Sequence, residues 1–399
     1  MAVTSNLGDL MMPRVEEFLS RHPKIEARPY QKRIIAKTVE AWTSPEGSQN
    51  KHQHINVESP VGSGKTCMGI VSNAIMQEID PTYIATWCAM KRNLLAQVVE
   101  EVKKYEIKLD IVPISMFDDE PPMHLVKGRK IIHNEDESHH QAASSAITLR
   151  ATMQEASVAP LLSQGLSGTP IRADGMKLAY SLVIRDASAR QLISDGYLSK
   201  FDYYSLDKWS AKVAVKTYTE CPERWGRSVM FFHTKIECEK VLKGLKRAGI
   251  RAALVDENPI RRIDQLAEFA KGKWQVLVGC LSLTEGFNDP ELQTVFLRSS
   301  NKGISIQMGG RALRKSPNFA RKQIVQATKG WCFMKYATPS GQFVRVNDEW
   351  RTVEANENVD KVSSVMIKLI AERALQPVTK MEEMLANRLK GKPRIMSAP

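Results

Sequence analysis

The sequence predicts an α/β protein built on parallel sheets, and three observations support that prediction. An alternating apolar run at residues 54–58 leads into a glycine-rich turn, which is followed by apolar residues at helical spacing. Strands are then expected at 83–87 and 107–115, with a helix between them at 91–105. A later apolar run ends in the acidic group at 135–137. Strands that alternate with helices in this way indicate a parallel sheet.

The glycine-rich turn has the composition of a phosphate-binding loop. It fits the pattern G-x-x-x-x-G-K-[ST], except that Ser59 stands at the first glycine. Glycines let backbone N–H groups approach a triphosphate, and the next helix adds its positive end. Lys65 is predicted to reach the β- and γ-phosphates, and the Thr66 hydroxyl to bind Mg²⁺. The other turn residues predicted to surround the nucleotide are Pro60, Val61, Gly62, Ser63 and Gly64. The alternative is a flexible Gly/Ser turn without a ligand.

A second candidate contact with the nucleotide precedes this loop. Pro29 is well placed to begin a helix that runs to about Trp42. A glutamine amide can pair with both the donor and the acceptor of an adenine edge. Arg28 and Gln31 are therefore predicted to contact the nucleotide.

The acidic group follows a predicted strand, which places it at the ligand-binding edge of the sheet. Hydrolysis of a nucleotide needs one carboxylate near the metal and another that orients and deprotonates the attacking water. Asp136 is assigned to the metal and Glu137 to the water. The alternative is a solvated acidic turn, because Glu135 extends the group to three acids.

Composition narrows the class of protein. The 399 residues carry a net charge of +13 with a pI near 9.4, which favours an anionic polymer as partner. The six cysteines are scattered and form no C-x-x-C pair, which argues against a zinc site or a disulfide framework. No apolar run reaches membrane-spanning length and no signal peptide is evident. A cytoplasmic protein without a membrane partner is expected.

Five further motifs follow in a fixed order. They are Gly165-Leu166-Ser167-Gly168-Thr169-Pro170, Asp195-Gly196-Tyr197-Leu198-Ser199, Val229-Met230-Phe231-Phe232, Leu283-Thr284-Glu285-Gly286-Phe287 and Ile306-Gln307-Met308-Gly309-Gly310-Arg311-Ala312-Leu313-Arg314. With the loop and the acidic box, this series resembles the superfamily two helicases and translocases of the DExH type, in the RadD- and UvsW-like branch. The resemblance covers about residues 25–335.

The resemblance implies two tandem RecA-like parallel-sheet domains with an ATP cleft between them. Domain 1 is expected at 1–205 and domain 2 at 206–345, followed by a small, mainly helical C-terminal extension with a basic tail at 346–399. One departure concerns the strand before the acids, which carries His133, Asn134 and Glu135 where the family is apolar. This departure predicts a looser placement of Asp136.

The final motif also has a physical interpretation. Arg311 and Arg314 are three residues apart, so one helix face can direct both guanidinium groups at a transferring phosphoryl group. The resemblance adds Gln307 to the catalytic set and Gly286 to the nucleotide contacts. It assigns His139, Ser167 and Thr169 to coupling, and it places nucleic-acid contacts at Lys91, Arg92, Gln97 and Thr284.

The implied function is that of an ATP- and Mg²⁺-dependent DNA helicase or translocase acting in replication, recombination or repair. DNA, single-stranded or branched, is the expected partner of a monomer, with a replication or recombination protein as a further partner. The alternative is a nucleic-acid-stimulated ATPase that remodels protein–DNA complexes or anneals strands without net unwinding. Analogy favours a phage or mobile-element origin, and thus the cytoplasm of a bacterial or phage-infected cell.

Overall fold

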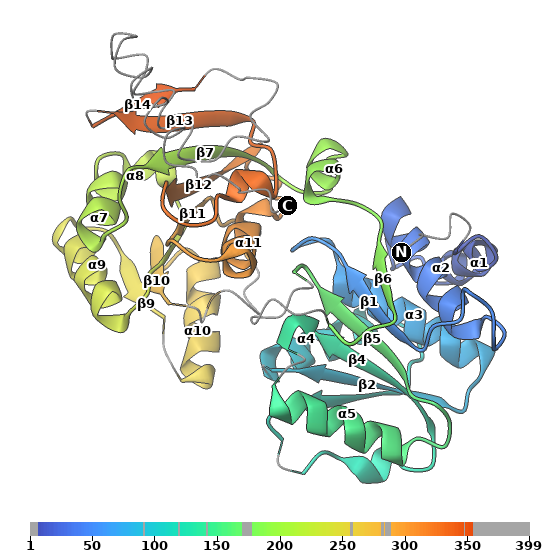
Figure 1. The fold of residues 1–399 in the computed structure, drawn as a ribbon. Coiled ribbons are helices and arrows are strands. Elements are labelled where there is room, and N and C mark those ends of the chain that lie inside the picture. The colour runs from blue at the N-terminus through green and yellow to red at the C-terminus, as the bar shows by residue number, and fades with distance from the viewer. Residues whose placement is uncertain are drawn as a thin grey trace, which may run out of the picture.

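The computed structural model describes residues 7–90, 92–118, 120–140, 143–169, 178–255, 258–280, 283, 289–346 and 348–353. Two sheets lie side by side, each with helices on both faces (Figure 1). This arrangement confirms the predicted α/β class with two RecA-like domains. No helix in these ranges is long and apolar enough to cross a lipid bilayer.

The first sheet has six parallel strands in the order β3-β2-β4-β5-β1-β6. Their bounds are β1 His54–Glu58, β2 Tyr83–Ala89, β3 Ile111–Ser115, β4 Lys130–Asp136, β5 Leu162–Ser167 and β6 Leu182–Arg185. The helices of this domain are α1 Met12–Arg21, α2 Pro29–Thr43, α3 Lys65–Ile79, α4 Arg92–Tyr105 and α5 Ser144–Ala156. Helix α5 packs on one face of the sheet, and α3 and α4 pack on the other.

The second sheet has eight strands in the order β14-β13-β7-β12-β11-β8-β10-β9, and only the β13–β14 pair is antiparallel. Their bounds are β7 Lys200–Leu206, β8 Ser228–Phe231, β9 Ala252–Leu254, β10 Val276–Gly279, β11 Thr294–Leu297, β12 Arg321–Ala327, β13 Gly341–Val346 and β14 Glu349–Thr352. The helices are α7 Ala211–Thr219, α8 Pro222–Trp225, α9 Lys235–Arg247, α10 Pro259–Ala270 and α11 Lys302–Gly310. The short helix α6 (Ala189–Ser194) lies between the domains (Figure 1).

The strand pairing corrects the predicted domain limits at both ends of domain 2. Strand β7, expected at the end of domain 1, pairs with β12 and β13 in the second sheet. The hairpin of β13 and β14 extends that sheet to Thr352, beyond the predicted limit at 345. Both strands join partners that are distant in sequence, which local patterns do not reveal. The predicted helical extension lies otherwise outside the described residues.

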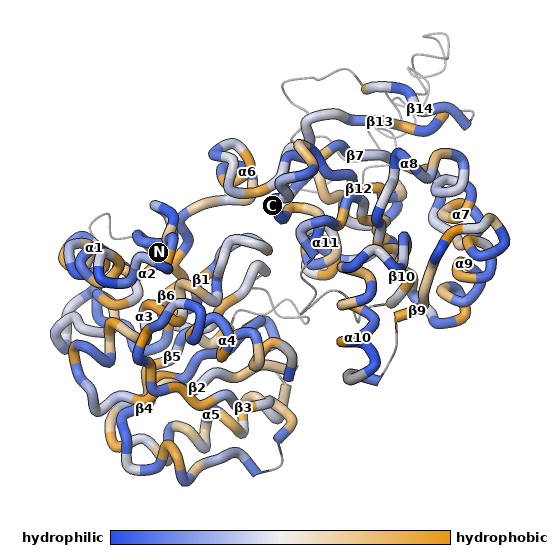
Figure 2. Tube along the Cα trace, turned by 180° about the vertical axis from the view of Figure 1, so that it is seen from behind, coloured by the Kyte–Doolittle hydropathy of each residue, from blue (hydrophilic) through white to orange (hydrophobic). Residues whose placement is uncertain are grey.

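Apolar residues are concentrated along the strands of the two sheets (Figure 2). Figure 2 shows apolar stretches running along the strands, while the helices alternate between apolar and polar positions. One apolar cluster continues from domain 1 into domain 2 through Leu198, Leu313 and Phe333. The edges of the two domains are therefore joined by packed side chains as well as by the chain itself.

Candidate nucleotide site between two domains

The phosphate-binding loop lies between the end of β1 and the start of α3. Gly62 and Gly64 have φ values of +83° and +79°, a left-handed conformation that favours glycine. Ser59 is buried, and its hydroxyl donates a 2.7 Å hydrogen bond to Ser63 Oγ. The serine that replaces the first glycine thus links the two ends of the turn by a hydrogen bond. The two glycines keep the left-handed backbone of a phosphate-binding loop.

The start of α2 holds this loop from the other side. Gln31 Nε2 and the Tyr30 hydroxyl both donate to the Ser63 carbonyl, at 2.8 and 2.6 Å. Gln31 Oε1 accepts from the Arg28 backbone N–H at 2.7 Å, so both ends of this amide bond to protein. The Arg28 guanidinium lies 5.2 Å from the centre of the Tyr197 ring. Tyr30 was not predicted, because a hydroxyl that serves the loop has no local sequence signal.

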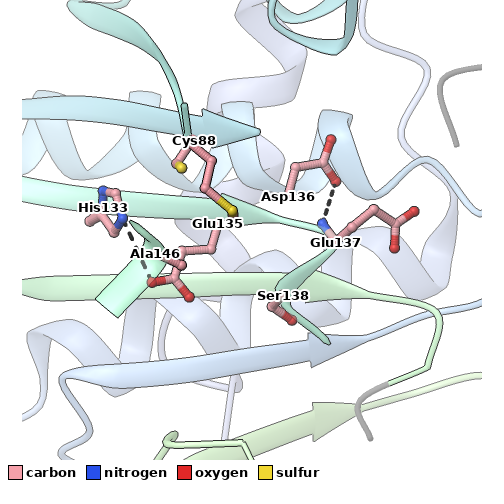
Figure 3. A pocket seen from close by; sticks show the side chains of 8 residues that line it. Cys88, His133, Glu135, Asp136, Glu137, Ser138 and Ala146 are labelled. Atoms are coloured by element: carbon pink, nitrogen blue, oxygen red, sulfur yellow. Dashed lines mark hydrogen bonds and ion pairs between the residues drawn. The ribbon is translucent and has the colours of Figure 1, made fainter. Parts of the chain in front are cut away.

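The acidic pair lies at the carboxyl end of β4. Asp136 pairs with Leu166 of β5, which in turn pairs with Val57 of β1, so the acids are level with the loop. Glu137 has φ +52°, an uncommon conformation for a residue with a side chain. Its N–H donates to Asp136 Oδ1 at 3.0 Å, and Figure 3 shows both side chains pointing the same way. This is an ordered strand terminus and not a solvated acidic turn.

The pKa of the Lys65 amine is influenced by charged groups of both domains. Burial lowers the pKa of its amine, and the neighbouring carboxylates of Glu137 and Asp136 act in the opposite direction. The guanidinium groups of Arg311 and Arg314, from the other domain, lower the same pKa further. Charged groups of both domains are therefore near enough to influence the same amine.

The arginines reach this region by a different geometry from the one predicted. Helix α11 ends at Gly310, Arg311 begins a 3₁₀ turn, and Arg314 follows in an extended conformation. The expectation of a single helix face is therefore wrong, although both side chains still approach the loop. Arg311 is buried, and Arg314 Cγ lies 3.3 Å from where a Cβ on Gly62 would be. Burial and the charge of Arg311 lower the pKa of Arg314 to about 9.

His139 connects three of the predicted motifs. Gln307 Nε2 lies 2.7 Å from His139 Nε2 across the domain boundary, and His139 Nδ1 lies 3.2 Å from Ser167 Oγ. The amide nitrogen can only donate, so His139 Nε2 accepts in this bond. Thr169 N–H donates to Ser167 Oγ at 3.0 Å, and Glu137 Oε2 lies 3.4 Å from His139 Nδ1. The structure brings all of these predicted coupling residues together.

The predicted nucleic-acid residues are only partly described. Arg92 and Gln97 are exposed on α4, which begins just beyond the carboxyl end of β2. The Arg92 guanidinium lies 3.2 Å from Asp118. Lys91, Thr284 and Gly286 lie outside the described residues, so their predicted contacts stay predictions.

Two family profiles match the chain, one in each domain. Residues 24–120 match the type III restriction enzyme res subunit, and residues 211–316 match the helicase conserved C-terminal domain. This chain carries the ATP-hydrolase core of superfamily two. The matches include the phosphate-binding loop in the first domain and both arginines in the second.

Individual relatives of this superfamily two core are distant. A Schizosaccharomyces pombe protein named as a mitochondrial ATP-dependent helicase, irc3, is 26% identical over 212 residues, which are 45% of this chain and 35% of that protein. The chain thus matches about a third of that relative's length.

Solved structures share the fold at low sequence identity. The DEAD-box helicase Mss116 bound to single-stranded RNA has a TM-score of 0.59 at 13% identity, over 82% of this chain and 75% of that one. The type ISP restriction-modification enzyme LlaBIII bound to DNA has 0.55 at 14%, over 86% and 29%. The helicase MrfA bound to DNA has 0.55 at 15%, over 79% and 50%.

Proposed function

We propose that this chain is an ATP-dependent motor that moves along DNA or unwinds it. The observation that carries the proposal is the contact of the two domains at the phosphate-binding loop and the acidic box: Arg314 packs beside Gly62, and Gln307 bonds to His139 at 2.7 Å. Hydrolysis of a nucleotide held by both domains couples chemistry to their relative movement. A motor needs that coupling, whereas a static binding module does not.

Each charged group has a distinct task in this proposal. Lys65 would bind the β- and γ-phosphates, together with the N–H groups of the loop. Glu137, whose backbone is held in the left-handed region, would orient the attacking water and accept its proton. Arg311 and Arg314 would neutralise charge that develops on the transferring phosphoryl group. Their desolvated setting strengthens each of these interactions.

The side chains present fit a magnesium ion. The Thr66 hydroxyl, at the second residue of α3, and the Asp136 carboxylate supply hard oxygen ligands. Mg²⁺ in nucleotide sites usually takes one or two carboxylates and completes its shell with phosphates and water. When bound, the ion would bridge phosphate oxygens and neutralise their charge. Thr66 and Asp136 would hold it, Asp136 through water.

Coupling would depend on the contact between Gln307 and His139. This hydrogen bond joins the two domains, so it forms only while they are together. Its acceptor, His139, lies 3.4 Å from the Glu137 carboxylate. Ser167 and Thr169 continue the contact toward the segment that follows β5. We therefore assign Gln307 and His139 to sensing closure rather than to bond cleavage.

The exposed side chains and the net charge favour a nucleic acid as the track, and the similar proteins weigh toward DNA. Arg92 begins α4 at the same edge of the first sheet as the acidic pair, and Gln97 is exposed further along that helix, so a phosphate backbone could pass there. The net charge of +13 favours a polyanion. The res-subunit profile and the DNA-bound neighbours LlaBIII and MrfA weigh toward DNA, although Mss116 is bound to RNA. A role in replication, recombination or repair, in the RadD- and UvsW-like branch and of phage origin, completes the proposal.

The decisive experiment is steady-state ATP hydrolysis by the full chain at fixed moderate salt. The protein is assayed alone and with single-stranded DNA, duplex DNA, forked DNA and single-stranded RNA. Strong stimulation by one of the DNAs supports the proposal, and strand displacement then separates unwinding from translocation or remodelling. Stimulation by RNA alone, or hydrolysis that ignores every nucleic acid, contradicts a DNA motor.

A further inference from the structure

A buried polar cluster lies behind the acidic box, between the first sheet and α5. Glu135 is only 4% exposed, and the Tyr180 hydroxyl donates to its Oε2. Its Oε1 lies 3.7 Å from Arg150 NH1 and 3.6 Å from His133 Nε2. Figure 3 shows Glu135 and His133 directed away from the side chains of Asp136 and Glu137. Buried ionic clusters are costly, because each charge loses its hydration.

This cluster corrects the expectation that a polar strand loosens Asp136. His133 is buried and accepts or donates a 2.8 Å hydrogen bond with Thr86 Oγ1 on the neighbouring strand. Asn134 is fully buried and donates to the Thr86 carbonyl at 3.0 Å. The polar residues of β4 therefore tie that strand to β2 instead of leaving it exposed.

Tyr180 comes from a part of the chain that the sequence did not connect with the acidic box. It lies just before β6, in the stretch that follows the Ser167-Gly168-Thr169 motif. Its single hydroxyl proton is donated to Glu135, the residue directly before the catalytic pair. The residue directly after the pair is held separately, because the Ser138 hydroxyl donates to Asn56 Oδ1 at 2.7 Å.

The sheet provides a specific place for this phenol. Gly165 of β5 pairs with Glu135 of β4 and with Asn56 of β1. A Cβ at position 165 would lie 2.4 Å from Tyr180 Oη and 2.6 Å from Asn56 Oδ1. Any residue other than glycine would displace the ring. The glycine of this motif is thus explained by the tyrosine that lies across it.

We propose that Tyr180 is a positioning residue that fixes the acidic box from behind. The phenol holds the Glu135 carboxylate, and through the backbone that continues from Glu135 it holds Glu137 in its left-handed conformation. This inference rests on the proposed ATPase function of the same site.

The test compares two Tyr→Phe variants that lose the same atom. Tyr180→Phe removes the hydrogen bond to Glu135, while Tyr218→Phe removes a part-buried 2.8 Å hydrogen bond to the Gly226 carbonyl in domain 2. Tyr180→Phe is expected to lower kcat about tenfold at saturating ATP, with KM and the Kd of a fluorescent ADP unchanged. Tyr218→Phe is expected to leave all three values at the wild-type level. Equal kcat in both variants overturns the proposal.

Two further measurements keep the result unambiguous. Amide hydrogen exchange at residues 134–140 is expected to accelerate about tenfold in Tyr180→Phe and to stay unchanged in Tyr218→Phe. Unchanged exchange in Tyr180→Phe overturns the positioning role, even if the wild type hydrolyses no ATP and the proposed function itself fails. Glu135→Gln retains an acceptor for the phenol, so its kcat should lie closer to wild type than that of Glu135→Leu. The reverse order also contradicts the proposal.

Discussion

Gly310→Ala tests whether the two domains approach as closely during turnover as they do in the structure. A Cβ at position 310 would meet Val61 of the opposite domain, with Cβ, Cγ2 and Cγ1 at 2.7, 2.9 and 3.1 Å. Gly310 has φ −59° and ψ −19°, which alanine adopts without strain. The clash is thus confined to the closed arrangement. Overpacking of this kind costs about 1–3 kcal/mol.

That cost converts into a measurable loss of activity. At about 1.36 kcal/mol per tenfold, closure should be disfavoured by roughly 5- to 160-fold, and kcat/KM for ATP should fall by the same factor. The midpoint of thermal unfolding should not fall, because alanine is a better helix former than glycine by up to about 1 kcal/mol. The assays are steady-state hydrolysis and a thermal melt on the same preparations.

Two other glycines of α11 serve as controls. A Cβ on Gly303 meets only Asn301 Oδ1, at 3.8 Å, so Gly303→Ala should leave both hydrolysis and the melting temperature near or above wild type. A Cβ on Gly309 would lie 2.3 Å from the Phe333 ring within the same domain, so Gly309→Ala should lower the melting temperature. Wild-type turnover by Gly310→Ala would refute the inference that hydrolysis requires this closed arrangement.

Three substitutions test the assigned roles directly. Lys65→Ala should reduce turnover at least about 100-fold, because the phosphates lose their main cation; activity near wild type would remove Lys65 from the catalytic set. Glu137→Gln should lower kcat by about 10²- to 10⁴-fold while a fluorescent ATP analogue still binds, so loss of binding would contradict a role confined to the water. Gln307→Leu should lower the stimulated rate by about 2- to 13-fold through the lost bond to His139, with basal hydrolysis spared. Equal loss of basal and stimulated rates would argue against a coupling role.

Local features of the site were predictable because each depends on a short stretch of sequence. The phosphate-binding loop and Lys65 lie between the end of β1 and the start of α3, and the acidic pair lies at the end of β4. Arg311 and Arg314 lie beyond the end of the helix on which the prediction put them. The residue types of this motif indicated its chemistry, whereas the sequence did not reveal that the helix ends at Gly310, before the two arginines.

Features that depend on distant pairing were not predictable. Strand β7 carries no signal of its sheet, because its partners β12 and β13 lie more than 100 residues further along the chain. In the sequence, Glu135 departs from an apolar strand, and its partners Arg150 and Tyr180 come from α5 and from the stretch before β6. A buried charge can be interpreted only when its counterpart is known.

The engagement of the Gln31 amide bears on which nucleoside the site accepts. Its oxygen and nitrogen both bond to the chain itself, at the Arg28 N–H and the Ser63 carbonyl. Each of these bonds uses one of the two amide hydrogens or one of the two lone pairs of the amide oxygen, so one donor and one acceptor remain for a base. A donor and an acceptor side by side suit the N7 and N6 groups of adenine, whereas guanine presents two acceptors at the same edge. The bonds to Arg28 and Ser63 fix the direction in which the amide presents this pair, so selection of ATP over GTP would depend on the same contacts that hold the phosphate-binding loop.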